Sequence, residues 1–451
     1  MLKLLGLYIL TLLIWGRLMK LHSNDSNIEN YNESYNKTTV SRYKSIPLIQ
    51  SPILYDKHNI STYLHIIHES IRIIQLPNSL STLITNKCNS LWRPKLPLID
   101  HQHGVELIFP IILNDMSTAA KSGRCDIDPL WNANAMSKDH QPILYYIQSY
   151  VYHAVYCTDK KNNKEDWTKR DPYWLELATY ITATTEWKDN MGIDFLIPAS
   201  HPESTPSRHH PTALGFLKRA SFLKTDFDVS GYDAKDVVVP YLSEKLTTDS
   251  NNRNRPILGF FAGGDNPKNG LRSMLSKAVQ KYSARANNDN NDVIFTTDKI
   301  PNYLEKMMAS KFCFIVRGDT SSSRRLFTAI AAGCIPVIIS DWIVLPFAEL
   351  IDYSKFTITF PESIVSNVDA MINRLLDIST NTKGYSEMVT SLKESRHYLL
   401  YDYVGDDDMK SIINPATLTL IEALVKRKEY CHKIASADDS LLCTLLRNTY
   451  L

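Results

Sequence analysis

Short segments that are apolar throughout alternate with helical patterns in the second half of this 451-residue chain. Four of them follow residue 250: ILGFFA (257–262), VIFT (293–296), FCFIV (312–316) and IPVIIS (335–340). Strands without polar alternation are buried on both faces, which is typical of a parallel sheet covered by helices on each side. The pattern therefore predicts a doubly wound α/β domain over roughly residues 256–400.

The same pattern is weaker in the first half of the chain. Residues 194–198 (DFLIP) and 236–240 (DVVVP) predict short buried strands. Residues 62–75 carry leucine and isoleucine at spacings of three and four, which predicts an amphipathic helix. The aromatic-rich residues 142–157 also predict a helix. Helical patterns near 361–378, 383–400 and 414–429 close the chain.

The chain begins with a charge-free apolar run from Leu4 to Trp15, which Lys3 precedes and Arg17 follows. The run is shorter than the ~20 residues that span a membrane, and it falls within the ~7–15 residues of a signal-peptide core. No clear cleavage site follows, so we interpret it as a signal anchor, with a cleaved signal peptide and a buried helix as the alternatives. An anchor predicts a single-pass type II protein whose remaining chain lies in the lumen.

Acceptor triplets for N-glycosylation cluster after this run. Three are at Asn24, Asn32 and Asn36, and a fourth is at Asn59. Such triplets also arise by chance in a chain rich in asparagine. Their position after a signal anchor nevertheless predicts glycosylation of at least one of them.

Composition divides the chain into four parts. Residues 21–46 are rich in Ser, Asn, Tyr and Thr, which is typical of a disordered stem. Folded sequence begins near Pro47, and an asparagine-rich stretch at 251–254 reads as a linker. We expect an anchor at 1–20, a luminal stem at 21–46, a Rossmann-like first domain at 47–250 and a second domain with closing helices at 251–451.

Charge and cysteine content exclude two classes of protein. The chain has 50 basic and 48 acidic residues, so its net charge is +2, without the basic excess that is typical of nucleic-acid binders. We therefore expect no nucleic-acid partner. Seven cysteines are too few for a disulfide scaffold, and the odd number leaves at least one thiol free or paired with another chain.

Two cysteines fall in apolar segments of the second half. Cys313 lies in a predicted strand and Cys334 in an apolar turn, so we expect both to be buried thiols. Disulfides are plausible elsewhere in an oxidising lumen, and their pairing stays open. The candidates are Cys431 with Cys443, or two of Cys88, Cys125 and Cys157.

Two polar turns follow predicted strands, at the edge where doubly wound sheets bind their ligands. The first is Gly263–Asp265, with Arg272 early in the next helix. The second is Arg317–Ser323, after which Arg324 and Arg325 open a helix. Backbone N–H groups, hydroxyls and guanidinium groups together favour a phosphate-bearing ligand, and a diphosphate suits them. The alternative is a serine-rich start that only caps the helix, beside solvated arginines.

These residues resemble a known family. The segment FCFIVRGDTSSSRRLFTAIAAGCIPVIISD (312–341), followed by LPFAELIDYSKF (345–356), is similar to the exostosin-type glycosyltransferases, family GT47, and more to their plant cell-wall members. The resemblance extends to RPILGFFAGG (255–264) and TDFDVSGYDAKDVVVPY (225–241), and more weakly to residues 171–201.

The resemblance implies a GT-B fold, in which two Rossmann-like domains face a cleft that holds a sugar nucleotide. The first domain would then take the acceptor and the second the donor. It also implies an inverting transfer from a UDP-sugar to a polysaccharide or glycan acceptor, by an enzyme of the Golgi membrane. A non-catalytic subunit of the same fold, supporting an active partner glycosyltransferase, and a sugar-binding surface protein are the alternatives.

The same resemblance implies roles for individual residues. It places Arg325 on the donor phosphates and Asp341 in the turn after the next strand. The other implied donor-site residues are Gly263, Arg272, Arg317, Gly318, Asp319, Thr320, Ser321, Ser322 and Ser323.

Two positions depart from the family pattern. Thr328 stands where the family usually has an acidic residue, and a threonine hydroxyl makes a weaker bond to ribose than a carboxylate does. Glu349 is shifted by one residue from the family's acidic position. Both departures favour an altered donor preference or an inactive relative.

An inverting transfer needs a base on the acceptor hydroxyl. His201 and Glu203 follow a predicted strand of the first domain and are our candidates, with Asp226 and Asp228 as the alternatives. Asp-x-Asp strings also occur, but they are frequent in a chain rich in aspartate. Because arginines and a helix amino end would neutralise the diphosphate, we expect no obligatory metal and no cofactor besides the UDP-sugar substrate.

Overall fold

The structure is a computed structural model of the chain, and all the residues that it describes belong to one compact unit, Gln50–Leu451. The described residues are 54, 71–74, 144–147, 170–199, 215–226, 235–243, 254–265, 270–286, 293–401 and 414–433.

Among the described residues, the first of two sheets has five parallel strands in sequence order, β1-β2-β3-β4-β5. Its strands are β1 (Ile71–Ile74), β2 (Leu144–Ile147), β3 (Phe195–Ala199), β4 (Ser221–Lys224) and β5 (Val237–Val238). Two helices, α8 (Arg170–Ala183) and α9 (Thr185–Asn190), precede β3. The core includes Trp174 of α8, whose ring meets Phe222 of β4 edge to face at 5.8 Å.

Two helix predictions in the first half were wrong. Residues 71–74 and 144–147, which we expected in helices, form the neighbouring strands β1 and β2. Both runs are short and mostly apolar, and periodicity alone does not distinguish a buried strand from a buried helix segment of that length. Their parallel pairing, Ile71 opposite Leu144, decides the outcome.

The second sheet is also entirely parallel and has the order β10-β9-β8-β6-β7. Its strands are β6 (Ile257–Ala262), β7 (Val293–Thr296), β8 (Ser310–Val316), β9 (Ile335–Ile339) and β10 (Ile358–Phe360). The chain runs outward from β6 to β7 and returns to the other side of β6 as β8. The strand order therefore reverses at β6 and β8, where α/β sheets place their ligands.

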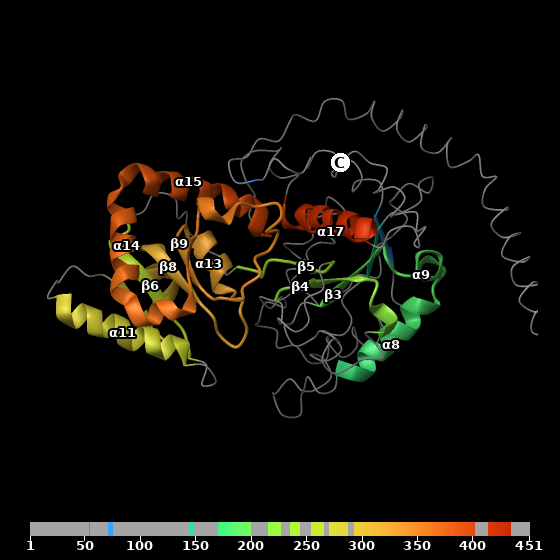
Figure 1. Cartoon of the computed structure of the whole chain (residues 1–451), viewed down its shortest axis with the longest axis horizontal. Helices are drawn as coiled ribbons and strands as arrows, with labels where there is room; N and C mark the ends of the chain where they lie inside the picture. Colours follow the sequence, from blue (N-terminus) through green and yellow to red (C-terminus); the bar gives the residue numbers. More distant parts are fainter. Residues whose placement is uncertain are drawn as a thin grey trace, which may run out of the picture. The chain divides into compact units, whose positions relative to one another are not determined.

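Helices cover this sheet, and α17 follows them along the chain and packs against α15 and β5 (Figure 1). Helix α11 packs against β7 and α14, while α13 packs against β9, α12 and α15. Right-handed crossovers put α11 on the opposite face from α12 and α13. The helices are α11 (Leu271–Ala286), α12 (Tyr303–Met308), α13 (Arg325–Ala332), α14 (Val368–Thr380), α15 (Thr382–Leu399) and α17 (Pro415–Lys433). The doubly wound arrangement that the sequence predicts here is confirmed.

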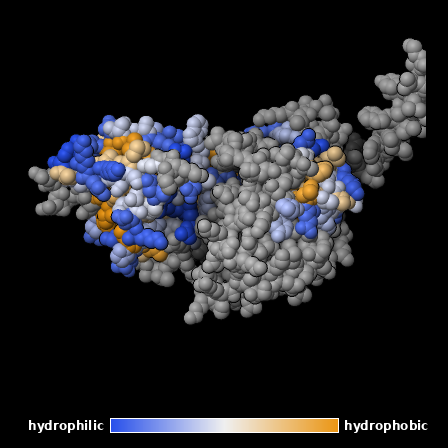
Figure 2. All heavy atoms as spheres, turned by 90° about the horizontal axis from the view of Figure 1, so that it is seen from below, coloured by the Kyte–Doolittle hydropathy of each residue, from blue (hydrophilic) through white to orange (hydrophobic). Residues whose placement is uncertain are grey.

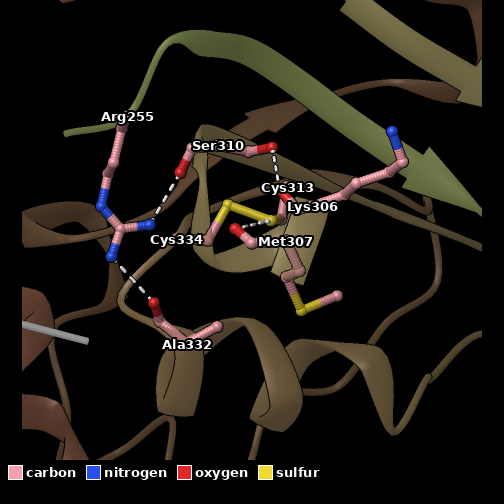
Figure 3. The surroundings of a disulfide bond; sticks show 7 residues. All are labelled: Arg255, Lys306, Met307, Ser310, Cys313, Ala332 and Cys334. Atoms are coloured by element: carbon pink, nitrogen blue, oxygen red, sulfur yellow. Dashed lines mark hydrogen bonds between the residues drawn. A yellow bond between two sulfur atoms is a disulfide. The ribbon is translucent and has the colours of Figure 1, made fainter. Parts of the chain in front are cut away.

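The expectation that Cys313 and Cys334 are separate thiols was wrong, because the two form a disulfide (Figure 3). Helix α13 ends at Gly333, whose positive φ of 68° reverses the chain. The crossover then starts β9 beside β8, which leaves the two Cα atoms 5.7 Å apart. Cys431 of α17 is also disulfide-bonded.

The surface of the described residues is largely hydrophilic, and hydrophobic residues form small separate patches on the face that Figure 2 shows. Large exposed hydrophobic side chains include Leu175, Met191, Phe216, Met274 and Trp342. Within the described ranges, no helix combines the length and the apolar character needed to cross a membrane.

Candidate functional site

Two polar turns lie side by side where the strand order of the second sheet reverses. Residues 263–265 follow β6, residues 317–323 follow β8, and these two strands are hydrogen-bonded neighbours. Arg272 of α11 donates from Nη1 to Gly264 O at 2.6 Å and from Nη2 to Val316 O at 3.0 Å, and so links the two turns. Arg325, the first residue of α13, donates from Nη2 to Ala262 O at 2.6 Å.

Both guanidinium groups lie against the ring of Phe261, a buried residue of β6. The Cζ atom of Arg325 is 4.4 Å from the ring centroid, and that of Arg272 is 5.5 Å from it. Two cations on one aromatic ring repel each other, although each gains from the ring. The site therefore holds two like charges close together.

The pKa of Arg272 reflects its burial and this neighbouring charge. Burial and the charge of Arg325 lower it to about 10, while Asp319 and Asp265 act in the opposite direction. A ligand with negative charge would offset the repulsion between the two arginines and raise this pKa. The Nη1 atom of the half-buried Arg325 makes no hydrogen bond to any described residue, so it is available to such a ligand.

Two glycines let the arginines approach the turns. A Cβ atom at Gly263 would overlap the Nη2 atom of Arg325. A Cβ atom at Gly318 would lie 2.6 Å from the Nη2 atom of Arg272. At Gly264, by contrast, a Cβ atom would meet nothing within 4 Å. Gly263 and Gly318 are therefore required for the close approach of the arginine side chains to the backbone.

Arg317 is balanced by a carboxylate that sequence reasoning missed. Its Nε atom lies 2.9 Å from Glu362 Oε1. Glu362 also accepts a hydrogen bond from the backbone N–H of Asp341 at 3.2 Å, and its own N–H donates to Asp341 Oδ1 at 2.8 Å. Arg317, Asp341 and Glu362 thus form one clamp across the ends of β8 and β9, next to the exposed Trp342.

The hydroxyl run after β8 is engaged with the first sheet. Ser321 Oγ donates to Asp226 Oδ1 at 3.2 Å, and the backbone N–H of Ser322 donates to Asp226 Oδ2 at 3.3 Å. Ser322 Oγ shares a hydrogen bond of 3.0 Å with the hydroxyl of Tyr241. Ser323 Oγ accepts from the backbone N–H of Arg325, the first residue of α13, at 3.3 Å. Asp226 and Tyr241 were not among the donor-site residues predicted from the sequence.

The remaining sequence-predicted residues are distributed unevenly. Thr328 belongs to α13 and is only 1% exposed, so its side chain lies in the core. Asp319 and Glu349 are both exposed. The charge of Asp319 raises the pKa of Arg272, and the charge of Glu349 raises the pKa of Glu422 in α17. Thr320 donates a side-chain hydrogen bond to Asp226. Other predicted positions lie outside the described residues: His201, Glu203, Asp228, Asn24, Asn32, Asn36 and Asn59.

Within the described ranges, no group of three or more His, Cys, Asp or Glu side chains is arranged to hold a metal ion. Arginines supply the positive charge at the two turns. The geometry is suited to binding an anion at the carboxyl ends of β6 and β8.

Comparison with known proteins identifies the family. The family model of the exostosin GT47 domain matches residues 144–375, which is just over half of the chain and includes both sheets except β1. The chain is 31% identical over 238 residues to a "Probable arabinosyltransferase" of Arabidopsis thaliana, a match that covers 50% of each protein.

Two further relatives are more distant. A "Probable glycosyltransferase" of Arabidopsis thaliana is 25% identical over 300 residues, which cover 60% of the chain and 51% of the relative. A "Probable glucuronosyltransferase" of Oryza sativa subsp. japonica is 28% identical over 211 residues, 43% of the chain and 49% of the relative. The chain thus spans about half the length of these curated relatives. The matched residues include both turns and both arginines, and the chain belongs to the exostosin GT47 family of glycosyltransferases.

Proposed function

We propose that the protein transfers a sugar from a UDP-sugar to a polysaccharide or glycan acceptor, with inversion at the anomeric carbon. The observation that carries the proposal is the pair Arg272 and Arg325 on Phe261, at the strand-order reversal of the second sheet. Negative charge grows on the diphosphate as the glycosidic bond to the donor sugar breaks. Guanidinium groups that are already in place stabilise that charge without reorganisation.

Arg325 is the central residue of the proposed donor site. Its Nη2 atom is fixed by Ala262 O, and its remaining donors can form a bidentate pair with a phosphate group. The amino end of α13 adds the partial positive charge of the helix dipole. With these charges the reaction needs no metal at the diphosphate. His201 or Glu203 is proposed as the base that deprotonates the acceptor.

The test is a screen of UDP-sugars with the purified full-length chain, measuring UDP affinity and donor hydrolysis. Arg325→Ala should lose about 30- to 1000-fold in turnover, the scale of one lost contact to developing charge. Arg325→Lys should restore only part of the loss, because an ammonium group lacks the planar fork. The neighbour Arg324→Ala is the matched control and should be milder.

The outcomes of the screen separate the alternatives. Near-normal UDP binding and turnover in Arg325→Ala would contradict the assignment of the site. UDP binding by the wild-type chain without transfer to any acceptor would favour a non-catalytic subunit instead. A loss of more than about tenfold on adding a chelator would show that a metal assists the diphosphate.

We propose a Golgi membrane location, with the anchor at residues 1–20 and the folded chain in the lumen. The basis is the apolar run and the acceptor triplets of the sequence. Protease treatment of intact microsomes should leave the folded chain undigested, and glycosidase should lower the mass of the protected form. Digestion of the chain in sealed vesicles would contradict this topology.

A further inference from the structure

A buried carboxylate, that of Asp226, joins the first sheet to the turn after β8. Asp226 follows the carboxyl end of β4, and its two oxygens accept from Ser321 Oγ and from the backbone N–H of Ser322. Ser321 and Asp226 are 95 positions apart in the sequence. Tyr241, which follows β5, bonds the Ser322 hydroxyl and places its ring 6.0 Å from that of Phe327 in α13.

Within the described part of the chain, hydrogen bonds hold this carboxylate. Asp226 is 4% exposed, and no Lys or Arg within the described ranges forms an ion pair with it. Burial raises the pKa of Asp226, and hydrogen bonds from Thr320, Ser322 and Ser321 oppose that shift. A buried charge is costly unless its hydrogen bonds are made, so the turn and the carboxylate depend on each other.

Its position makes Asp226 a poor base for the acceptor. Both of its oxygens already accept hydrogen bonds from the turn, and its side chain is almost inaccessible to solvent. A general base needs hydrogen-bond access to the hydroxyl that it deprotonates. The role of Asp226 therefore lies in the turn that it holds.

That turn sets the start of α13. Ser323 Oγ accepts from the N–H of Arg325, and Ser340 Oγ, at the end of β9, donates to Ser321 O at 2.9 Å. The turn is thus tied to the first sheet on one side and to β9 on the other. Fixing Ser321 and Ser322 fixes the residue at which α13 begins, and with it the guanidinium group of Arg325.

We propose that Asp226 is a positioning residue of the donor site. It is an internal anion that accepts hydrogen bonds from Ser321 and Ser322, so that the donor diphosphate binds at Arg325 and the Gly263 turn instead. The proposal rests on the proposed function. In this proposal Ser321 and Ser322 bind Asp226 and not the donor phosphates. Their effect on donor binding is therefore indirect.

The experiment uses the full-length chain and the variants Asp226→Asn, Ser321→Ala and the double variant, with UDP as the probe. Asn keeps the size of the side chain but cannot accept from both donors, so UDP affinity should fall about tenfold, the scale of one bond to a charged group. The melting temperature should change little, because Asn also removes a buried charge. Asp369→Asn, which breaks an exposed ion pair between α14 and α11, is the matched control.

The double variant separates an indirect from a direct role. If Ser321 acts through Asp226, the two changes share one effect, and Ser321→Ala should add less than about twofold in the Asp226→Asn background. Equal losses of UDP affinity from Ser321→Ala in both backgrounds would mean that Ser321 contacts the diphosphate itself. That result would overturn the internal-anion assignment.

A second readout needs no ligand. Amide hydrogen exchange at Ser322 should speed up at least about tenfold in Asp226→Asn, because its N–H loses a charged acceptor. Unchanged exchange at Ser322 in Asp226→Asn would overturn the positioning role, whatever the UDP results. A wild-type chain that binds no UDP but shows faster exchange in Asp226→Asn would instead contradict the proposed function and leave the contact between the sheets supported.

Discussion

At the scale of single residues, the candidate site depends on glycines, whose lack of a side chain lets the arginines approach the backbone. Gly263 provides the space in which the Arg325 guanidinium reaches Ala262 O. Gly318 provides the space for the Arg272 guanidinium, which donates to Gly264 O and Val316 O. Gly264, one residue away, borders open space. Two adjacent glycines of the same turn thus have different structural requirements.

This difference yields a matched pair of variants. Gly263→Ala should displace the Arg325 guanidinium, and UDP affinity should fall about tenfold or more, since small misplacements of binding groups are costly. Gly264→Ala should bind UDP within about twofold of the wild type. Calorimetric titration with UDP, together with melting temperatures, measures both effects. Equal affinities of the two variants would refute the role of Gly263 in placing Arg325.

At the scale of elements, the unit β8–α13–β9 carries the candidate site at one end and a disulfide and hydrogen bonds that stabilise it at the other. The disulfide between Cys313 and Cys334 lies near the amino end of β9 (Figure 3). Beside it, Arg255 donates at 2.8 Å to Ser310 O and at 2.8 Å to Ala332 O, and so joins the start of β8 to the end of α13. The stability of this unit and the binding site at its other end are therefore separable.

Removing the disulfide tests that separation. The double variant Cys313→Ala, Cys334→Ala should lose about 3 kcal/mol of stability without reducing agent, since the bond closes a loop between residues 21 positions apart. UDP affinity below the melting temperature should be kept. Thermal unfolding and UDP titration measure these effects, and peptide mapping under non-reducing conditions should find the linked pair. Free thiols at both positions would contradict the bond.

At the scale of the whole molecule, α17 carries buried charges next to the first sheet. Lys426 lies 3.2 Å from Glu422 Oε1 and donates to Asp236 O, beside β5, at 2.7 Å. Asp236 in turn pairs with Lys224 of β4 at 2.6 Å. Helix α17 is thus linked through its buried charges to residues at two strands of the first sheet.

Glu422 makes this link dependent on pH. Burial raises its pKa to about 7, against the effect of Lys426, and the charge of Glu349 raises it further. Tyr353, whose own pKa is raised by burial and by Glu422, also faces it. The folded chain therefore binds this proton more tightly than the unfolded chain does. The contribution of Glu422 to the free energy of unfolding therefore falls as the pH rises from about 4.5 to about 7.

Denaturant unfolding between pH 5 and 8 should show this loss in the wild type, and Glu422→Gln should flatten it. The glutamine stays neutral over the whole range, so the linked proton is removed while the side chain keeps its size. Glu362→Gln, which changes a carboxylate just after β10 instead, serves as a comparison. Parallel pH profiles of wild type and Glu422→Gln would show that another group controls the stability.

The sequence alone predicted the elements whose local signal is strong. The strands of the second sheet are apolar on both faces and are separated by helices with clear periodicity, so β6, β7, β8 and β9 were found at nearly their observed positions. The runs that became β1 and β2 were read as helices. Short apolar runs fit both structures, and the choice depends on a partner strand that lies far along the chain.

The candidate site divides in the same way. Glycines, hydroxyls and arginines in two turns were enough to select Gly263, Arg272 and Arg325, which the structure brings together, while their binding of an anion stays a prediction. The tertiary structure alone assigned Arg317 to Glu362, brought Asp226 to Ser321 and joined Cys313 to Cys334. Local propensity and motif spacing act over a few residues, whereas these pairs form only because strand order and crossovers bring distant segments together.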